Sequence, residues 1–166
     1  MRKQLVHIYD DTISLENLLV AWRAFVKGKR NKTDVQMFQY CLSDNILALH
    51  DELKNKTYRH GGYHAFKISD PKPRDIHKAS VCDRIVHHAL YRVLYPFFDK
   101  KFIADSYSCR NERGTHKSNS RFQEFARQVS CNNTKTCFVL KCDIKKFFAS
   151  IDHEILVKIL KQHIVD

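Results

Sequence analysis

Apolar residues in the first third of the chain recur at the spacing of an amphipathic helix. The first stripe predicts a helix over residues 14–27, with Ser14 as its N-cap, and comprises Leu15, Leu18, Leu19, Trp22, Phe25 and Val26. A second stripe predicts a helix over residues 33–54. There Thr33 is the expected cap and Gln36, three residues later, completes a capping-box pattern. Both stripes indicate a packed helical core, joined by a basic loop over residues 28–33.

The pattern changes after Tyr58, where alternating residues and turn formers replace the helical stripe. Gly61 and Gly62 interrupt the chain, and the segment YHAFKIS predicts a strand with Tyr63, Ala65 and Lys67 on one face. The tetrapeptide DPKP predicts a turn, and RDIHKAS predicts the returning strand. This stretch therefore predicts a β-hairpin.

The remainder of the chain predicts two helices, a strand and a terminal helix. The helices are expected over residues 80–98, with Asp83 and Arg84 in the first turn, and over residues 116–129. Residues 131–136 read as a loop. Cys137 to Cys142 are mostly apolar and β-compatible, as in a strand covered on both faces. A last helix is expected over residues 155–164, and Asp152 looks like its cap. The elements together predict an α+β fold.

Charge is the most informative property of the composition. The 166 residues include 29 basic and 18 acidic side chains, a net charge of +11. This excess favours a polyanionic partner, and nucleic acid is commoner than a membrane; the alternative is a basic protein without such a partner. Six cysteines lack the close pairs of zinc sites, which indicates free thiols in a reducing compartment. With no apolar run of about 18 residues and no signal-peptide pattern, we expect a cytoplasmic protein that does not span a membrane.

Asp143 directly follows the predicted buried strand. A carboxylate held at a strand end suits a metal ligand, since Mg²⁺ prefers carboxylates together with substrate phosphates. Taken alone, an Asp in this position more often begins a turn or caps the next helix. The residues around it decide between these interpretations. The segment D-I-K-K-F-F-x-S-I-D-H, starting at Asp143, closely resembles the first catalytic motif of reverse transcriptases, especially those of group II introns, retrons and diversity-generating retroelements.

This resemblance implies roles for three residues. Asp143 would bind both catalytic Mg²⁺ ions, and the backbone carbonyl of Ile144 would assist. Phe148 would lie under the sugar of the incoming nucleotide, where its ring would clash with a ribose 2′-hydroxyl and so select deoxynucleotides. Many group II relatives carry a second Asp after the aromatic pair; Ala149 stands here instead and receives no role.

Three further segments resemble this family, in the family's order. The hairpin is similar to the fingers hairpin, which implies that Arg74, with Lys67 or Lys72, grips the incoming triphosphate. The segment CDRIVHHAL resembles the D-R-I/V-V helix that packs fingers against palm. The segment DSYSCRNERGTHKS resembles the family's S-Y loop, which implies template or primer backbone contacts by a cluster of basic residues, Arg110, Arg113, His116, Lys117 and Arg121.

Each of these basic groups has a plainer interpretation. Charges on a hairpin are commonly just solvated, and the cluster from Arg110 to Lys117 could be a solvated helix start. His87 and His88 are adjacent on a helix and point to different sides, so a shared metal ion is disfavoured. The four motifs gain their weight from occurring together and in order.

The implied fold is helical fingers with a β-hairpin, over residues 1–135, followed by the first strand and helix of a polymerase palm, over residues 136–166. The family's second catalytic motif, Y-x-D-D, does not occur in this sequence, and Asp152 follows Asp143 too closely to replace it. We therefore expect an N-terminal part of a right-hand polymerase that is inactive alone, because two-metal nucleotidyl transfer needs further carboxylates.

The expected partners of the whole enzyme follow from the same resemblance. They are an RNA template, a DNA primer, deoxynucleoside triphosphates and two Mg²⁺ ions, and an exposed strand edge would favour a homodimer of the fragment. A rival hypothesis is a non-catalytic reverse-transcriptase-like domain that only binds RNA. A third is a basic helical protein whose similarity is accidental.

Overall fold

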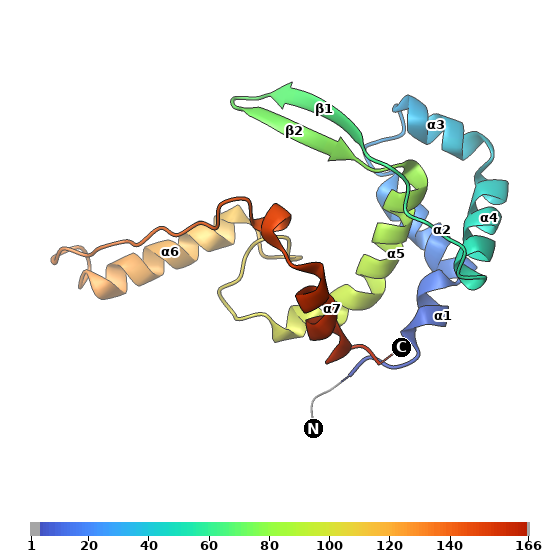
Figure 1. Cartoon of the computed structure of the whole chain (residues 1–166). Helices are drawn as coiled ribbons and strands as arrows, with labels where there is room; N and C mark the ends of the chain where they lie inside the picture. The colour runs from blue at the N-terminus through green and yellow to red at the C-terminus, as the bar shows by residue number, and fades with distance from the viewer. Residues whose placement is uncertain (1–3, 166) are drawn as a thin grey trace. The chain divides into compact units, whose positions relative to one another are not determined.

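The computed structural model describes residues 4–165 and has an α+β fold (Figure 1). Within these residues it contains seven α-helices and one two-stranded antiparallel sheet, as the sequence predicted at the level of fold class. The described residues divide into two compact units, residues 4–97 with 163–165 and residues 98–162. This division does not test the predicted boundary between fingers and palm at residue 135. No helix within residues 4–165 has the length and apolar character needed to cross a bilayer.

The first unit is built on a helical core. Its helices are α1 (Ile8–Ile13), α2 (Leu15–Phe25), α3 (Thr33–Tyr40), α4 (Leu42–Lys54) and α5 (Val81–Phe98). Leu18, Phe25, Leu49 and Ile85 are at most 1% exposed, so the stripes seen in the sequence do meet in one core. Burying each such side chain contributes roughly 1.5–3 kcal/mol to folding. Ser14 caps α2 as predicted, since its hydroxyl accepts a hydrogen bond from the Asn17 amide.

The predicted single helix over residues 33–54 is wrong in two respects. The structure breaks it at Cys41, between α3 and α4. The Asn45 side chain donates to the Phe38 carbonyl at 3.0 Å, which satisfies an acceptor left by the break. The break lets Phe38 stack on Trp22 while α4 turns its own stripe inward. The cap prediction also fails, because Lys32 occupies the N-cap position and Thr33 is already helical.

The predicted hairpin is confirmed. Strands β1 (His64–Ser69) and β2 (Pro73–Lys78) pair in an antiparallel register that places Ser69 opposite Pro73, with the turn at residues 70–72. Every residue of β1 is exposed, and Figure 1 shows the two strands as a ribbon that projects from the helices of this unit. The hairpin is therefore held mainly at its base.

The second unit contains few buried side chains compared with the first. It contains a short 3₁₀ turn (Asp99–Lys101), α6 (Thr115–Val129), a second 3₁₀ turn (Phe147–Ser150) and α7 (His153–Lys161). Asp152 caps α7, as predicted, by accepting from the amides of Glu154 and Ile155. Ser130 is the one buried residue among those described in this unit.

The predicted buried strand over Cys137 to Cys142 is not formed. Figure 1 draws this segment without an arrow, and Phe138 and Leu140 are 94% and 87% exposed. A strand needs a neighbour for its backbone hydrogen bonds, and the two strands of the described chain pair with each other. The segment has the composition of a buried strand but finds no pairing partner within residues 4–165.

Candidate nucleotide and nucleic-acid site

The three hairpin residues singled out by the sequence are all exposed, but they do not share one face. Lys67 lies opposite Asp75 across the ladder, and Arg74 lies opposite Ile68. Directly paired residues of an antiparallel ladder lie on the same face, and successive residues alternate. Lys67 and Arg74 are therefore on opposite faces, while Lys72 lies in the turn that joins the two strands.

The base of the hairpin is tied to two helices by Asp34. One oxygen of this carboxylate, Oδ2, lies 2.8 Å from Lys78 Nζ at the end of β2 and 2.6 Å from Arg84 Nη2 in α5. Partial burial would raise the pKa of Asp34. The hydrogen bonds and charges of Lys78 and Arg84 outweigh that effect and hold the pKa below its usual value. Asp34 thus connects α3, β2 and α5.

A second carboxylate, Asp83, is buried at the same end of the hairpin. It is 2% exposed and accepts hydrogen bonds from the Tyr58 hydroxyl at 2.7 Å, the Gly61 amide at 3.1 Å and the Ser80 hydroxyl at 2.7 Å. Burial alone would raise its pKa, but these three donors lower the pKa to about 2. Asp83 is therefore an ionised group held by neutral donors. We call Tyr58, Gly61, Ser80 and Asp83 the Asp83 cluster.

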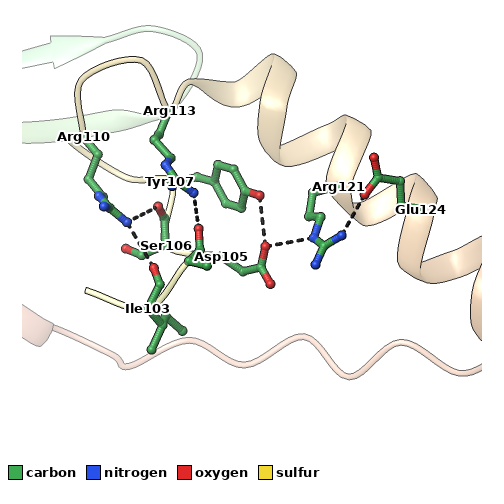
Figure 2. Close-up of polar contacts among 9 residues, drawn as sticks. Ile103, Asp105, Ser106, Tyr107, Arg110, Arg113, Arg121 and Glu124 are labelled. Carbon is green, nitrogen blue, oxygen red and sulfur yellow. Dashed lines mark hydrogen bonds and ion pairs between the residues drawn. The ribbon is translucent and has the colours of Figure 1, made fainter. Parts of the chain in front are cut away.

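In the second unit, Arg110 organises the loop that the sequence assigned to nucleic acid. Its Nε lies 2.7 Å from Asp99 Oδ1, and Nη2 donates to the Asp99 carbonyl at 3.0 Å. Nη1 donates to the carbonyls of Ile103 and Ser106 (Figure 2). The side chain is only 8% exposed. We call residues 99–113 the Arg110 loop. The N–H groups of the Arg110 side chain point into this loop and hold it together.

Arg113 and Arg121 extend this arrangement. Arg113 donates to the carbonyl of Ala104, while Arg121 lies between Asp105 Oδ1, at 3.0 Å, and Glu124 Oε2, at 2.8 Å (Figure 2). Asp105 also accepts from the Tyr107 hydroxyl. The hydrogen bond from Arg121 lowers the pKa of Asp105 more than any other influence. The loop is thus fastened to α6 by partly exposed polar contacts.

A polar hollow of about 550 Å³ lies beside these residues. Its lining includes Arg110, Arg113 and Lys117 together with Asp99 and Glu124. His116 and Lys117 are exposed in the first turn of α6, and the His116 backbone carbonyl accepts from Ser120. An exposed lysine beside helix N–H groups suits a phosphate. Arg110, Arg113 and Lys117 thus line one hollow, with Arg110 inside the loop and Lys117 at its surface, whereas His116 is exposed at the start of α6 and is not among the lining residues.

The residues assigned to catalysis lie in the extended segment and the turn that follows it. Asp143 is exposed, Ile144 is 65% exposed and Phe148 is 85% exposed, with its ring 5.3 Å from that of Phe147. Lys146 adopts a left-handed conformation, φ 54°, where the extended segment enters the 3₁₀ turn. Asp143 and the aromatic pair are therefore open to solvent and near each other in sequence.

The donor set at Asp143 suits Mg²⁺ in kind but not in number. A carboxylate and a backbone carbonyl are the hard oxygen ligands that this ion prefers. No cluster of three or more His, Cys, Asp or Glu side chains able to hold a metal occurs among residues 4–165. Asp152 is occupied as the cap of α7. Asp143 and Ile144 could thus supply part of a coordination sphere.

Sequence reasoning missed Asp34 and treated Asp83 only as part of a motif. An Asp is common in the first turn of a helix, so the sequence pattern gave no reason to single out either residue. The available signal was an acidic residue, Asp83, in the first turn of a largely apolar helix, because a carboxylate needs partners if it is buried. The partners themselves come from Tyr58 and Gly61, 25 and 22 residues earlier.

Comparison with known proteins adds one relative. No family model matches the chain. The chain is 28% identical over 138 residues to Protein YkfC of Escherichia coli (strain K12), an alignment that covers 82% of this chain and 35% of that protein. The chain thus spans about a third of the length of this relative. The designation of that protein states no activity.

Proposed function

We propose that this chain is the N-terminal part of an RNA-directed DNA polymerase of prokaryotic retroelement type. The observation that carries the proposal is the order of four family-like segments along one basic chain: hairpin, D-R-I-V helix, S-Y loop and D-I-K-K-F-F. Any one of them could arise by chance. Their joint occurrence in the family's order is what favours a polymerase over an unrelated basic protein.

The hairpin would bind the triphosphate of the incoming deoxynucleotide. Strand β1 is exposed along its length, and the exposed Lys72 and Arg74 lie near the turn. Arg74 can present its planar guanidinium to two phosphate oxygens, and Lys72 adds a point charge. The turn therefore has the charge and accessibility that phosphate binding requires.

The Arg110 loop and the start of α6 would contact the backbone of template or primer. Lys117 and His116 are the accessible groups, and Arg110 would keep the loop in shape beneath them. Contacts of this kind position a duplex without reading its sequence. The net charge of +11 would add a long-range attraction for the same ligand.

Asp143 and the carbonyl of Ile144 would hold Mg²⁺ together with carboxylates from elsewhere in the full-length protein. When bound, the ions stabilise the attacking and leaving oxygens of the phosphoryl transfer. The chain's own contribution would be to supply the Asp143 carboxylate from the same short segment as Phe148. The Phe148 ring would lie under the sugar and exclude a 2′-hydroxyl.

The decisive experiment is primer extension by the full-length protein that contains this chain. With an RNA template, a DNA primer, deoxynucleotides and Mg²⁺, we expect extension by the unchanged protein and none by Asp143→Asn. Asp51→Asn, which removes an exposed carboxylate of α4, is the matched control and should extend normally. The 166-residue chain alone should not extend the primer.

Three results would contradict parts of this proposal. Full activity of Asp143→Asn would remove the catalytic assignment. Robust extension by the 166-residue chain would show that no further carboxylates are needed. Tight binding of a primer–template without any extension by the full-length protein would favour the non-catalytic RNA-binding alternative.

A further inference from the structure

The Asp83 cluster joins the segment that enters the hairpin to the segment that leaves it. Tyr58 and Gly61 precede β1, and Ser80 follows β2. All three donate to the carboxylate of Asp83, which itself lies in the first turn of α5. One side chain therefore fixes both ends of the hairpin to one helix of the core.

The two carboxylate oxygens of Asp83 accept hydrogen bonds from different segments. Oδ1 accepts from Tyr58 and Gly61, on the entering segment, and Oδ2 accepts from Ser80, on the leaving segment. The Ser80 hydroxyl in turn accepts from the Asp83 amide at 3.1 Å. Because Asp83 is buried, loss of any of these donors would leave part of a charge uncompensated.

Close packing at Gly61 supports the same arrangement. A Cβ atom at this position would lie 3.1 Å from Asp83 Oδ2. A side chain there would require the carboxylate or the entering segment to shift by a few tenths of an ångström. Gly61 thus permits the approach that its amide needs in order to donate to Asp83.

Asp34 adds a second tie to the leaving strand. It holds Lys78, the last residue of β2, and Arg84 of α5 with the same oxygen. This tie is partly exposed, since each of Lys78 and Asp34 is 36% exposed. Of the two carboxylates, only Asp83 contacts both ends of the hairpin.

We propose that Asp83 is a positioning residue that fixes the direction in which the hairpin presents Lys72 and Arg74 to an incoming nucleoside triphosphate. The ligand in this inference comes from the proposed function. The mechanical part, which is the restraint of the hairpin by Asp83, concerns this chain alone. The ladder between β1 and β2 does not need Asp83. Its loss should therefore free the hairpin as a unit without melting it.

The mechanical part is tested on the 166-residue chain by backbone ¹⁵N relaxation. In the unchanged chain we expect order parameters for residues 64–78 close to those of α4, near the value of about 0.85 found for rigid backbone. In Asp83→Ala they should fall well below those of α4, while the β1–β2 cross-strand contacts persist. Tyr58→Phe removes one tie to the entering segment and should give a smaller fall. Asp51→Asn is the control and should leave the values unchanged.

The functional part is tested on the full-length protein by steady-state extension with dTTP. We expect Tyr58→Phe and Asp83→Asn to raise KM for dTTP several-fold with little change in kcat, because the phosphate-binding groups lose their fixed direction. Arg74→Ala is the reference variant, since it removes a proposed contact directly. A general loss of stability would instead lower the active fraction and leave KM unchanged.

The outcomes separate this inference from the proposed function. A hairpin as rigid in Asp83→Ala and Tyr58→Phe as in the unchanged chain would overturn the positioning role. If Arg74→Ala raises KM and the cluster variants do not, the positioning role fails and the proposed function stands. If none of these variants, Arg74→Ala included, changes KM, the hairpin does not bind the triphosphate. That part of the proposed function is then wrong. If Asp83→Ala does not fold, Tyr58→Phe and Asp83→Asn decide by the same criteria.

Discussion

Lys67 and Arg74 lie on opposite faces of the hairpin, because Lys67 is paired with Asp75 and Arg74 with Ile68. The sequence left open whether Lys67 or Lys72 joins Arg74 in the proposed contact with the triphosphate. The register favours Lys72, which lies in the turn beyond the last pair, Ser69 and Pro73, and is not committed to either face. Lys67, in contrast, faces an acidic neighbour across the ladder, and such opposite-charge pairs are stabilising.

This register leads to a prediction about nucleotide affinity. In the full-length protein, Lys72→Ala and Arg74→Ala should each raise KM for deoxynucleotides, about tenfold for the loss of roughly 1.4 kcal/mol of phosphate binding. Lys67→Ala should leave KM nearly unchanged. Steady-state extension kinetics measure all three. A Lys67→Ala effect as large as that of Arg74→Ala would show that the two side chains reach one triphosphate despite their opposite faces.

Acid unfolding should reveal the ionised state of Asp83. Its pKa of about 2 lies below the value of 3.8 expected in the unfolded chain. A group with a lowered folded pKa stabilises the protein above its unfolded pKa, and this contribution disappears as the pH falls through the folded pKa. At neutral pH we therefore expect Asp83→Asn to lower the free energy of unfolding by about 2 kcal/mol.

The pH dependence distinguishes this effect from simple damage to the core. The difference in unfolding free energy between the unchanged chain and Asp83→Asn should be constant at neutral pH and shrink as the pH falls from 3.8 toward 2. Urea unfolding followed by the fluorescence of Trp22, the one tryptophan, measures it in reducing buffer. A difference that stays constant down to pH 2 would mean that the lost charge is not its source.

Arg110 and Lys117 should respond differently to substitution, although both are basic residues of the same hollow. Lys117→Ala should weaken binding of an RNA–DNA duplex and reduce the slope of log affinity against log salt by about one, as expected for one phosphate contact. Fluorescence anisotropy at several salt concentrations measures this slope. An unchanged slope would remove Lys117 from the interface.

Arg110→Ala should instead disrupt the loop. Loss of the ion pair between the buried Arg110 and the half-buried Asp99, and of three further hydrogen bonds to carbonyls, should cost about 3 kcal/mol of local stability. Hydrogen exchange of residues 99–113 should become faster. Arg110→Lys should not restore protection, because a lysine cannot reach all of these acceptors at once. Normal exchange in Arg110→Ala would show that the loop is held by other contacts.

Phe148 provides a test of sugar selection. Its ring is 85% exposed and contributes little to packing among the described residues, so Phe148→Ala should fold normally. In the full-length protein this change should raise the incorporation of ribonucleotides relative to deoxynucleotides, because the clash with the 2′-hydroxyl is removed. Competition between dTTP and UTP in primer extension gives the ratio. Phe147→Ala is the neighbouring control and should alter the ratio less.

Local signals in the sequence predicted most elements correctly. The stripe from Leu15 to Val26 and the Ser14 cap gave α2 because helical spacing and a capping hydroxyl act within a few residues. The two prolines around Lys72 marked the turn of the hairpin for the same reason. The break at Cys41 was not predictable, since it follows from how Phe38 meets Trp22 in the core.

The apolar run before Asp143 shows what local sequence signals cannot predict. This run has the composition of a buried strand, yet a strand also requires a hydrogen-bonding neighbour, which composition does not specify. Within residues 4–165 that neighbour is missing, and the run is exposed. The motif that begins at Asp143 is nevertheless readable from the sequence, because it consists of consecutive residues.

The sequence by itself thus determined most of the helices, the hairpin, the basic character and the motif around Asp143, all of which depend on neighbours in the chain. Only the tertiary structure decided that Asp83 joins Tyr58 to Ser80, that Asp34 holds Lys78 and Arg84, and that Arg110 turns inward. The physical reason is that a buried or paired charge is defined by the donors that reach it. For Asp34 and Asp83 several of those donors come from residues more than 20 positions away.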